Sequence, residues 1–327
     1  MNFAEVEKIA AAILYEGYIL YPYRASSIKN RQRWNFGTLY PRIYAEAQRP
    51  PEPFRLVAEC VAEAGPENAC LDLKIQFLQL LRQQKEASSA SDGMHGLSDP
   101  SLEWDEAIER CTICTLQLDE LLEQPLARSF AVQAAATVPE GRRPADLQIE
   151  LRAEVSALPD GARKIHIEIE NDNPLPSGAD ATREEALPLS FVSAHVLLGI
   201  ERGNFVSLLD PPESYREAVA SCQNVGVFPV LAGNEPDRSM MLCSPIILYD
   251  YPKIAPESEG DFFDGTEMDE MLALRVLTLS DAEKEEMRHG DPLARRILER
   301  TESLTAENMI KAHGVIRGMR EIRGGTS

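Results

Sequence analysis

The sequence predicts an α+β fold with an antiparallel, β-rich and sandwich-like middle flanked by N-terminal and C-terminal helices. Three observations predict it: apolar residues recur at helical spacing over 2–16, they alternate with polar residues over 129–171, and helix-capping pairs return beyond residue 256. The same patterns divide the chain into three regions, which we expect to pack as one compact unit. The regions are a mostly helical 1–123, a β-rich core 124–255 and a helical 256–327.

The N-terminal region begins with the helix expected over residues 2–16. Prolines then interrupt the chain before an apolar run at 54–64, and a longer run at 68–86 fits a helix or, in part, a strand. Small and polar residues at 87–101 predict a loop, and we expect 102–123 to be helical or mixed.

The middle region carries the clearest strand signals. Alternating residues over 129–138, 146–158 and 163–171 predict half-buried strands, and residues 202–204, Arg-Gly-Asn, predict a hairpin. Beyond a short helix at 213–221, apolar runs predict two more strands. Because proline cannot donate to a sheet ladder, it places parts of these two strands at an edge or a bulge. The two runs and their prolines are 225–233 with Pro229 and 240–251 with Pro245.

The C-terminal region shows three helix-start signals. Ser280 and Glu283 form a capping box, Asp291-Pro292 places proline at the first position of another helix, and Thr305 can cap the last one. Helices are therefore expected throughout 256–327.

Composition limits the class of protein. The 327 residues carry a net charge of −20, and a field of this sign disfavours nucleic-acid binding. The chain has neither an apolar run of about 18 residues nor a positively charged secretory signal, so we expect a cytoplasmic protein without a membrane span. Its six scattered cysteines fit reduced thiols in such a compartment.

An aromatic and basic segment at 20–44 stands out against this acidity. Arginine and aromatic residues are enriched in the hot spots of protein interfaces, so we predict that the segment binds a partner protein. The predicted partner-binding residues are Tyr21, Tyr23, Arg24, Lys29, Arg31, Arg33, Trp34, Phe36 and Tyr40. Two alternatives stay open: the segment packs against the acidic remainder of its own chain, or Arg24 and Arg33 hold a small anionic ligand.

Cys111 and Cys114 form a C-x-x-C pair that could bind zinc, nickel or iron, or act as a redox pair. No second pair of ligands with suitable spacing follows, and two small core residues on a helical face explain the pattern equally well. We therefore expect no cofactor, with a metal site at this pair as the weaker alternative.

Two further clusters suggest binding. The acidic loop 256–270 fits a solvated helix start best, and a cation site or a docking site is the alternative. Because apolar side chains in so polar a loop need a surface to cover, Phe262, Phe263 and Asp264 are the candidates for a secondary docking site. His166, Glu168 and Glu170 share one face of a predicted strand, which fits a divalent metal site less well than an ordinary wet face.

The common catalytic motifs are absent. The sequence contains no G-x-S-x-G, no phosphate-binding glycine loop and no H-E-x-x-H, and we expect His195 to be a hydrogen-bonded core residue. An enzyme is thus the less favoured class.

Four segments resemble a family of uncharacterised bacterial proteins encoded beside uptake [NiFe]-hydrogenases and their maturation genes. They are YPYRASSIKNRQRWNFGTLYP, LLGIERGNFVSLLDPPE, NVGVFPVLAG and SPIILYDYPKIAPESEGDFFDGTEMDEMLALRVLTLSDAEKEEMR. The resemblance covers most of the chain and is least clear over 87–101 and 124–185. It implies a non-enzymatic accessory protein that docks on a hydrogenase subunit or a maturation factor during assembly or stabilisation.

Overall fold

The structure, a computed structural model, has the predicted α+β fold. The residues that it describes are 1–15, 36–64, 69–81, 106–132, 135, 138, 144–254, 269–289 and 292–303. They belong to two compact units, one containing the described residues up to Lys253 and the other those from Ile254 onwards. The expectation of a single compact unit stays a prediction, and each unit is described by itself.

The first unit is built on two antiparallel sheets of five strands each. Sheet 1 has the order β4-β5-β6-β1-β8. Its strands are β4 (Leu126–Ala131), β5 (Gln148–Ala157), β6 (Ala162–Glu170), β1 (Arg55–Ala64) and β8 (Gly203–Phe205).

Sheet 2 has the order β3-β2-β7-β10-β9. Its strands are β3 (Glu106–Gln117), β2 (Cys70–Leu81), β7 (Val192–Glu201), β10 (Met240–Ser244) and β9 (Phe228–Ala232). The hairpin expected at 202–204 is not formed: the turn leads from β7 in sheet 2 to β8 in sheet 1, where β8 pairs with β1. Pro229 lies in β9 at the edge of the sheet, as predicted.

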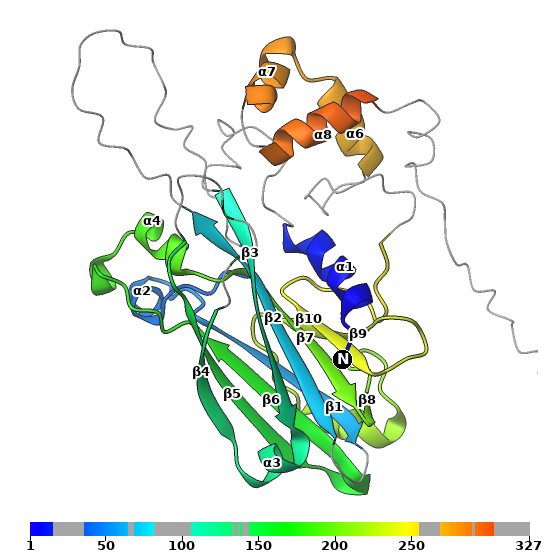
Figure 1. Ribbon diagram of the computed structural model, residues 1–327. Helices are drawn as coiled ribbons and strands as arrows, with labels where there is room; N and C mark the ends of the chain where they lie inside the picture. The colour runs from blue at the N-terminus through cyan, green and yellow to red at the C-terminus, as the bar shows by residue number, and fades with distance from the viewer. Residues whose placement is uncertain are drawn as a thin grey trace, which may run out of the picture. The chain divides into compact units, whose positions relative to one another are not determined.

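The two sheets pack face to face around one core (Figure 1). Alternate residues of each strand point inwards, such as Leu56 and Ala58 on β1 and Leu71 and Leu73 on β2. This alternation places the polar residues of sheet 1 on its outer face, where they are available for other contacts.

Strands replace helix in the region expected to be mostly helical. The apolar run 54–64 supplies β1, and 106–117 within the segment 102–123, which we expected to be helical or mixed, supplies β3. β1 contains three alanines and two glutamates, which favour strands weakly, so its pairing with β6 overrides local preference. β3 has isoleucine and threonine residues that favour a strand, and it pairs with β2. The region 1–123 therefore contributes three long strands as well as helices.

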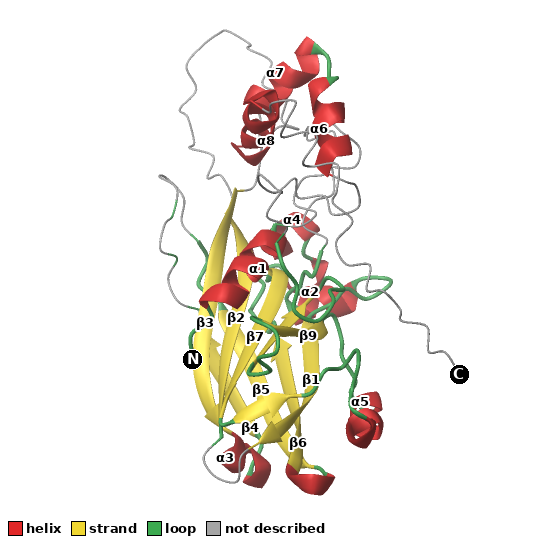
Figure 2. Ribbon diagram, turned by 90° about the vertical axis from the view of Figure 1, so that its right-hand side faces the viewer, coloured by secondary structure: helices red, strands yellow, loops and turns green. Residues whose placement is uncertain are grey.

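Helix α1 (Ala4–Leu14) confirms the predicted N-terminal helix. Its apolar face, with Val6 and Ala10, packs on Leu197 and Leu242 at the outer face of sheet 2 (Figure 2). The remaining α-helices of this unit are short: α2 (Arg42–Ala47), α3 (Leu118–Glu123), α4 (Arg183–Ala186) and α5 (Arg216–Ala220).

The second unit contains α6 (Asp269–Leu277), α7 (Asp281–His289) and α8 (Pro292–Ser303). Ser280 and Glu283 form the predicted capping box, since each side chain accepts the other's backbone N–H, at 2.9 and 3.4 Å. None of the helices within the described ranges is long and apolar enough to cross a membrane.

Candidate functional site

Most of the sequence-predicted partner surface lies outside the described residues. This applies to Tyr21, Tyr23, Arg24, Lys29, Arg31, Arg33 and Trp34, and to the secondary site at Phe262, Phe263 and Asp264. These assignments stay predictions.

The structure describes the last two residues of the aromatic and basic set. Phe36 is 37% exposed, and its carbonyl accepts the Ser193 N–H at 3.1 Å. Tyr40 instead lies in the interior, because its ring stacks 5.2 Å from that of Tyr44 and its hydroxyl accepts a hydrogen bond from Arg183 at 3.1 Å. Tyr40 therefore supports the fold and is not available to a partner.

The two cysteines of the C-x-x-C pair point in opposite directions. Both lie on β3, where residues three apart face opposite sides, so Cys114 packs against the core and Cys111 lies on the outer face beside Gln76. Burial raises the pKa of Cys114 to about 11, which keeps this thiol protonated. The helical face that we expected is absent, and the two sulfurs cannot bind one metal ion together.

His195 is a core residue, as predicted. It is fully buried, its Nδ1 lies 2.6 Å from the Ser193 carbonyl, and its Nε2 lies 3.3 Å from the hydroxyl of Ser244. Burial lowers its pKa to about 4. A neutral, enclosed imidazole of this kind stabilises the core and cannot reach a substrate.

Ion pairs cover the outer face of β6. Glu168 is buried between Arg55 and Arg152, at 3.2 and 2.8 Å, and Glu170 pairs with Arg42. Each carboxylate is thus matched by arginine rather than left open for a ligand. Across the described ranges, no group of three or more His, Cys, Asp or Glu side chains is arranged to hold a metal ion.

A groove of about 770 Å³ lies beside α3, between β3 and the start of β4. Its charged lining residues are Glu120, Glu123 and Arg128, which have mixed sign. The lining contains no histidine, cysteine or serine, so the groove does not offer the usual pairing of a nucleophile with a base.

The segment 245–253, which we call the strap, offers a more specific feature. The strand expected over 240–251 ends at Ser244, because proline follows at the next position. The strap then runs along the edge of β9: Asp250 accepts the Leu231 N–H at 2.8 Å and the Ser207 hydroxyl at 2.5 Å, and the Tyr251 N–H donates to the Leu231 carbonyl at 2.7 Å. Two strap residues, Leu248 and Tyr251, pack against the apolar clusters beneath.

These anchors hold the intervening side chains outwards. Ile247 is 74% and Tyr249 is 87% exposed, while Leu209 and Phe228 on neighbouring segments are 54% and 45% exposed. Phe228 pairs with Ser244 at the start of the strap, and Leu209 donates its N–H to the same Ser207 hydroxyl that binds Asp250. We call these four residues, Leu209, Phe228, Ile247 and Tyr249, the docking surface.

Acidic residues adjoin Leu209 and lie near Tyr251 of the strap. Asp210 follows Leu209 and is exposed, and the turn between β9 and β10 carries Glu235 and Asp237. Burial raises the pKa of Tyr251, and the negative charges of Asp250, Glu235 and Asp237 raise it further against the opposing effect of Arg238. Three carboxylates therefore act on the Tyr251 end of the strap.

The sequence signal for this surface was an apolar and aromatic run with flanking prolines, which we interpreted as a strand. Which of its side chains stay uncovered depends on distant anchors, and these are not visible in the sequence. Comparison with models of protein families and with curated proteins gives no match.

Proposed function

We propose that this chain is a non-enzymatic accessory protein that docks on a partner protein through the docking surface. The family resemblance supplies the partner class: a subunit of an [NiFe]-hydrogenase or one of its maturation factors. The role is assembly or stabilisation of that partner.

The exposure of Ile247 and Tyr249 supports this proposal most directly. Large apolar side chains held in water by a fixed backbone are unfavourable for a lone monomer, and a tyrosine in such a setting is a typical interface anchor. Since the strap is already ordered by Asp250, little conformational entropy remains to be lost on binding.

The charge pattern favours one kind of partner surface. Asp210 adjoins Leu209, and Glu235 and Asp237 act on Tyr251, so the matching surface should combine apolar side chains with lysine or arginine opposite these carboxylates. Opposite charges at the rim would mainly increase the association rate and select the partner.

Co-expression with the hydrogenase subunits and maturation factors tests the proposal. The tagged chain should co-purify with one of them in stoichiometric amount, and the combined substitution Ile247→Ala and Tyr249→Ala should weaken that complex by a factor on the order of 30 or more. The dissociation constant of the purified pair gives the measurement.

Ile113→Ala provides a matched control, because Ile113 is 50% exposed on β3 and lies outside the docking surface. This variant should bind like the wild type. Unchanged binding by the Ile247 and Tyr249 variant would refute docking at this surface, and loss of binding on replacing Arg31 and Trp34 instead would favour the segment 20–44.

A further inference from the structure

The groove beside α3 lies between the edges of two strands. It is lined by three successive residues of β3, 115–117, and by three successive residues of β4, 126–128. Because successive side chains of a strand point to opposite faces, three in a row line one cavity only where the strand turns its backbone edge towards it. Backbone edges therefore form two walls of the groove.

Both strands are outermost in their sheets. Within the described ranges, β3 pairs only with β2, and β4 pairs only with β5. The outer edge of such a strand carries backbone N–H and C=O groups that its own sheet does not pair, and it can accept a further strand. The groove of about 770 Å³ keeps this stretch of both edges open, with a volume typical of ligand sites.

The apolar lining of the groove belongs to the main core. Leu116 and Leu121 are buried and Leu126 is half-buried, and all three pack in the cluster between the two sheets. A peptide strand laid along the groove would turn every second side chain towards these leucines. The groove therefore suits a peptide in which every second residue is apolar.

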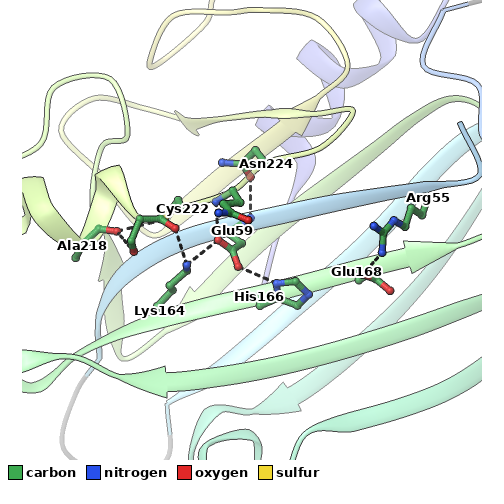
Figure 3. A network of polar contacts seen from close by, with 10 residues as sticks. Arg55, Glu59, Lys164, His166, Glu168, Ala218, Cys222 and Asn224 are labelled. Atoms are coloured by element: carbon green, nitrogen blue, oxygen red, sulfur yellow. Dashed lines mark hydrogen bonds and ion pairs between the residues drawn. The ribbon is translucent and has the colours of Figure 1, made fainter.

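Two glutamates of α3 determine the preferred charge of the peptide. Glu120 and Glu123 line the groove and are exposed, and no ion pair with another described residue neutralises either of them. The carboxylate of Glu59 on sheet 1, by contrast, lies 2.7 Å from Lys164 Nζ and 2.9 Å from His166 Nδ1 (Figure 3). The glutamates of the groove are thus available to a cation from outside the chain.

Arg128 carries the opposite charge at the β4 side of the groove. It lies two residues from Phe130, so both side chains point to the same face of β4, and its guanidinium lies 4.8 Å from the centre of the Phe130 ring. The charge of Arg128 is therefore held over this ring and forms no ion pair with Glu120 or Glu123.

We propose that the groove binds an extended peptide of a partner protein as an added strand, and that apolar residues alternate with lysine or arginine in this peptide. Its backbone pairs with the outer edge of β4 at residues 126–128. Its apolar side chains contact Leu116 and Leu121, and its basic side chains pair with Glu120 and Glu123. This site is separate from the docking surface and does not depend on the proposed docking function.

The peptide Val-Lys-Val-Lys-Val, with blocked ends and a fluorescein label, tests the inference. Its fluorescence anisotropy should rise to saturation on addition of the whole chain. The rearranged peptide Lys-Lys-Val-Val-Val has the same composition and charge but no alternation, so it should bind at least tenfold more weakly. Proline in place of the central valine should weaken binding as much, because it removes a backbone N–H from the added strand.

A double substitution in the chain tests the role of the two glutamates. Glu120→Gln combined with Glu123→Gln keeps the shape of both side chains and should weaken binding of the alternating peptide about fivefold or more. Glu154→Gln combined with Glu217→Gln is the matched control, because it removes two exposed carboxylates on β5 and α5, which do not line the groove. The control should bind like the wild type, although its net charge changes by the same amount.

Hydrogen exchange locates the added strand. The backbone amides of 126–128 should exchange more slowly when the alternating peptide is bound. Equal binding of the alternating and rearranged peptides, or unchanged exchange at 126–128, would refute the inference. Protection of these amides without peptide that is lost on dilution would place a second copy of the chain in the groove, and this result would refute it as well. None of these measurements involves Ile247 or Tyr249, so a negative result leaves the proposed docking function standing.

Discussion

At the scale of single residues, the most informative ionisable group of the core is His195. Its two nitrogens lie next to the Ser193 carbonyl and the Ser244 hydroxyl, and no part of the ring is exposed. Burial lowers its pKa to about 4, against about 6.5 for an ordinary histidine. Protonation of this side chain must therefore oppose folding.

The sign of the resulting pH dependence follows from the two pKa values. The unfolded chain binds the proton at higher pH than the folded protein, so the stabilising effect of a neutral His195 is complete above about pH 6.5 and is lost as the pH falls towards 4. Between pH 7 and pH 5, the free energy of unfolding of the wild type should fall by about 2 kcal/mol more than that of His195→Gln.

Urea unfolding at a series of pH values measures this difference. Asn204→Gln serves as the control, because Asn204 is exposed and has no ionisable group, so this substitution should leave the pH profile unchanged. Parallel profiles of the wild type and His195→Gln would show that His195 is not neutral and enclosed in solution.

At the scale of elements, a buried asparagine joins three separate segments at one end of the sandwich. Asn171, directly after β6, donates to the Leu39 carbonyl at 2.8 Å and to the Leu189 carbonyl at 2.9 Å, and its Oδ1 accepts from the Asn173 amide at 2.8 Å. The side chain is fully buried, so removing it leaves two carbonyls and one amide without this partner.

Asn171→Ala should accordingly lower the free energy of unfolding by about 3 kcal/mol, within the range for lost buried hydrogen bonds. Chemical denaturation measures the change. Asn204→Ala, at an exposed position in β8, should cost well under 1 kcal/mol, roughly the range for surface substitutions. Similar losses in the two variants would contradict the joining role of Asn171.

The same elements show which parts of the fold the sequence could predict. The strands of 146–158 and 163–171 alternate strictly, since one face is buried and the other is wet, and both formed as expected. The strands at 55–64 and 106–117 were missed. Their inward positions include small residues such as Ala58 and Cys114, so the alternation of large apolar and polar residues that indicates a strand is weak there. Such segments become strands because they pair with strands that are distant in the sequence.

The candidate site was predictable only in part, for a similar physical reason. The sequence shows that Ile247 and Tyr249 are apolar, but their exposure follows from Asp250, which is bound to Ser207 and Leu231. The carboxylate of Glu59 likewise accepts the N–H of Gln223, which lies 164 positions further along the sequence. Neither arrangement can be predicted from the spacing of apolar and polar residues along the sequence.

At the scale of the whole molecule, the net charge and the exposed apolar side chains both fit the proposed docking function. A net charge of −20 keeps the chain soluble and repels its own copies, while the docking surface provides an apolar area for a partner of opposite charge. The strap and the sandwich together present that area on a fixed scaffold. This arrangement is the basis of the proposed docking function.

Site-specific crosslinking tests the docking claim most directly. A photo-crosslinking amino acid placed at position 249, in cells that produce the hydrogenase and its maturation factors, should form an adduct that contains one of those proteins. The same amino acid at position 113, on an exposed part of β3, should form none. Adducts with these proteins from position 34 but none from position 249 would contradict the account and place the partner on the aromatic and basic segment instead.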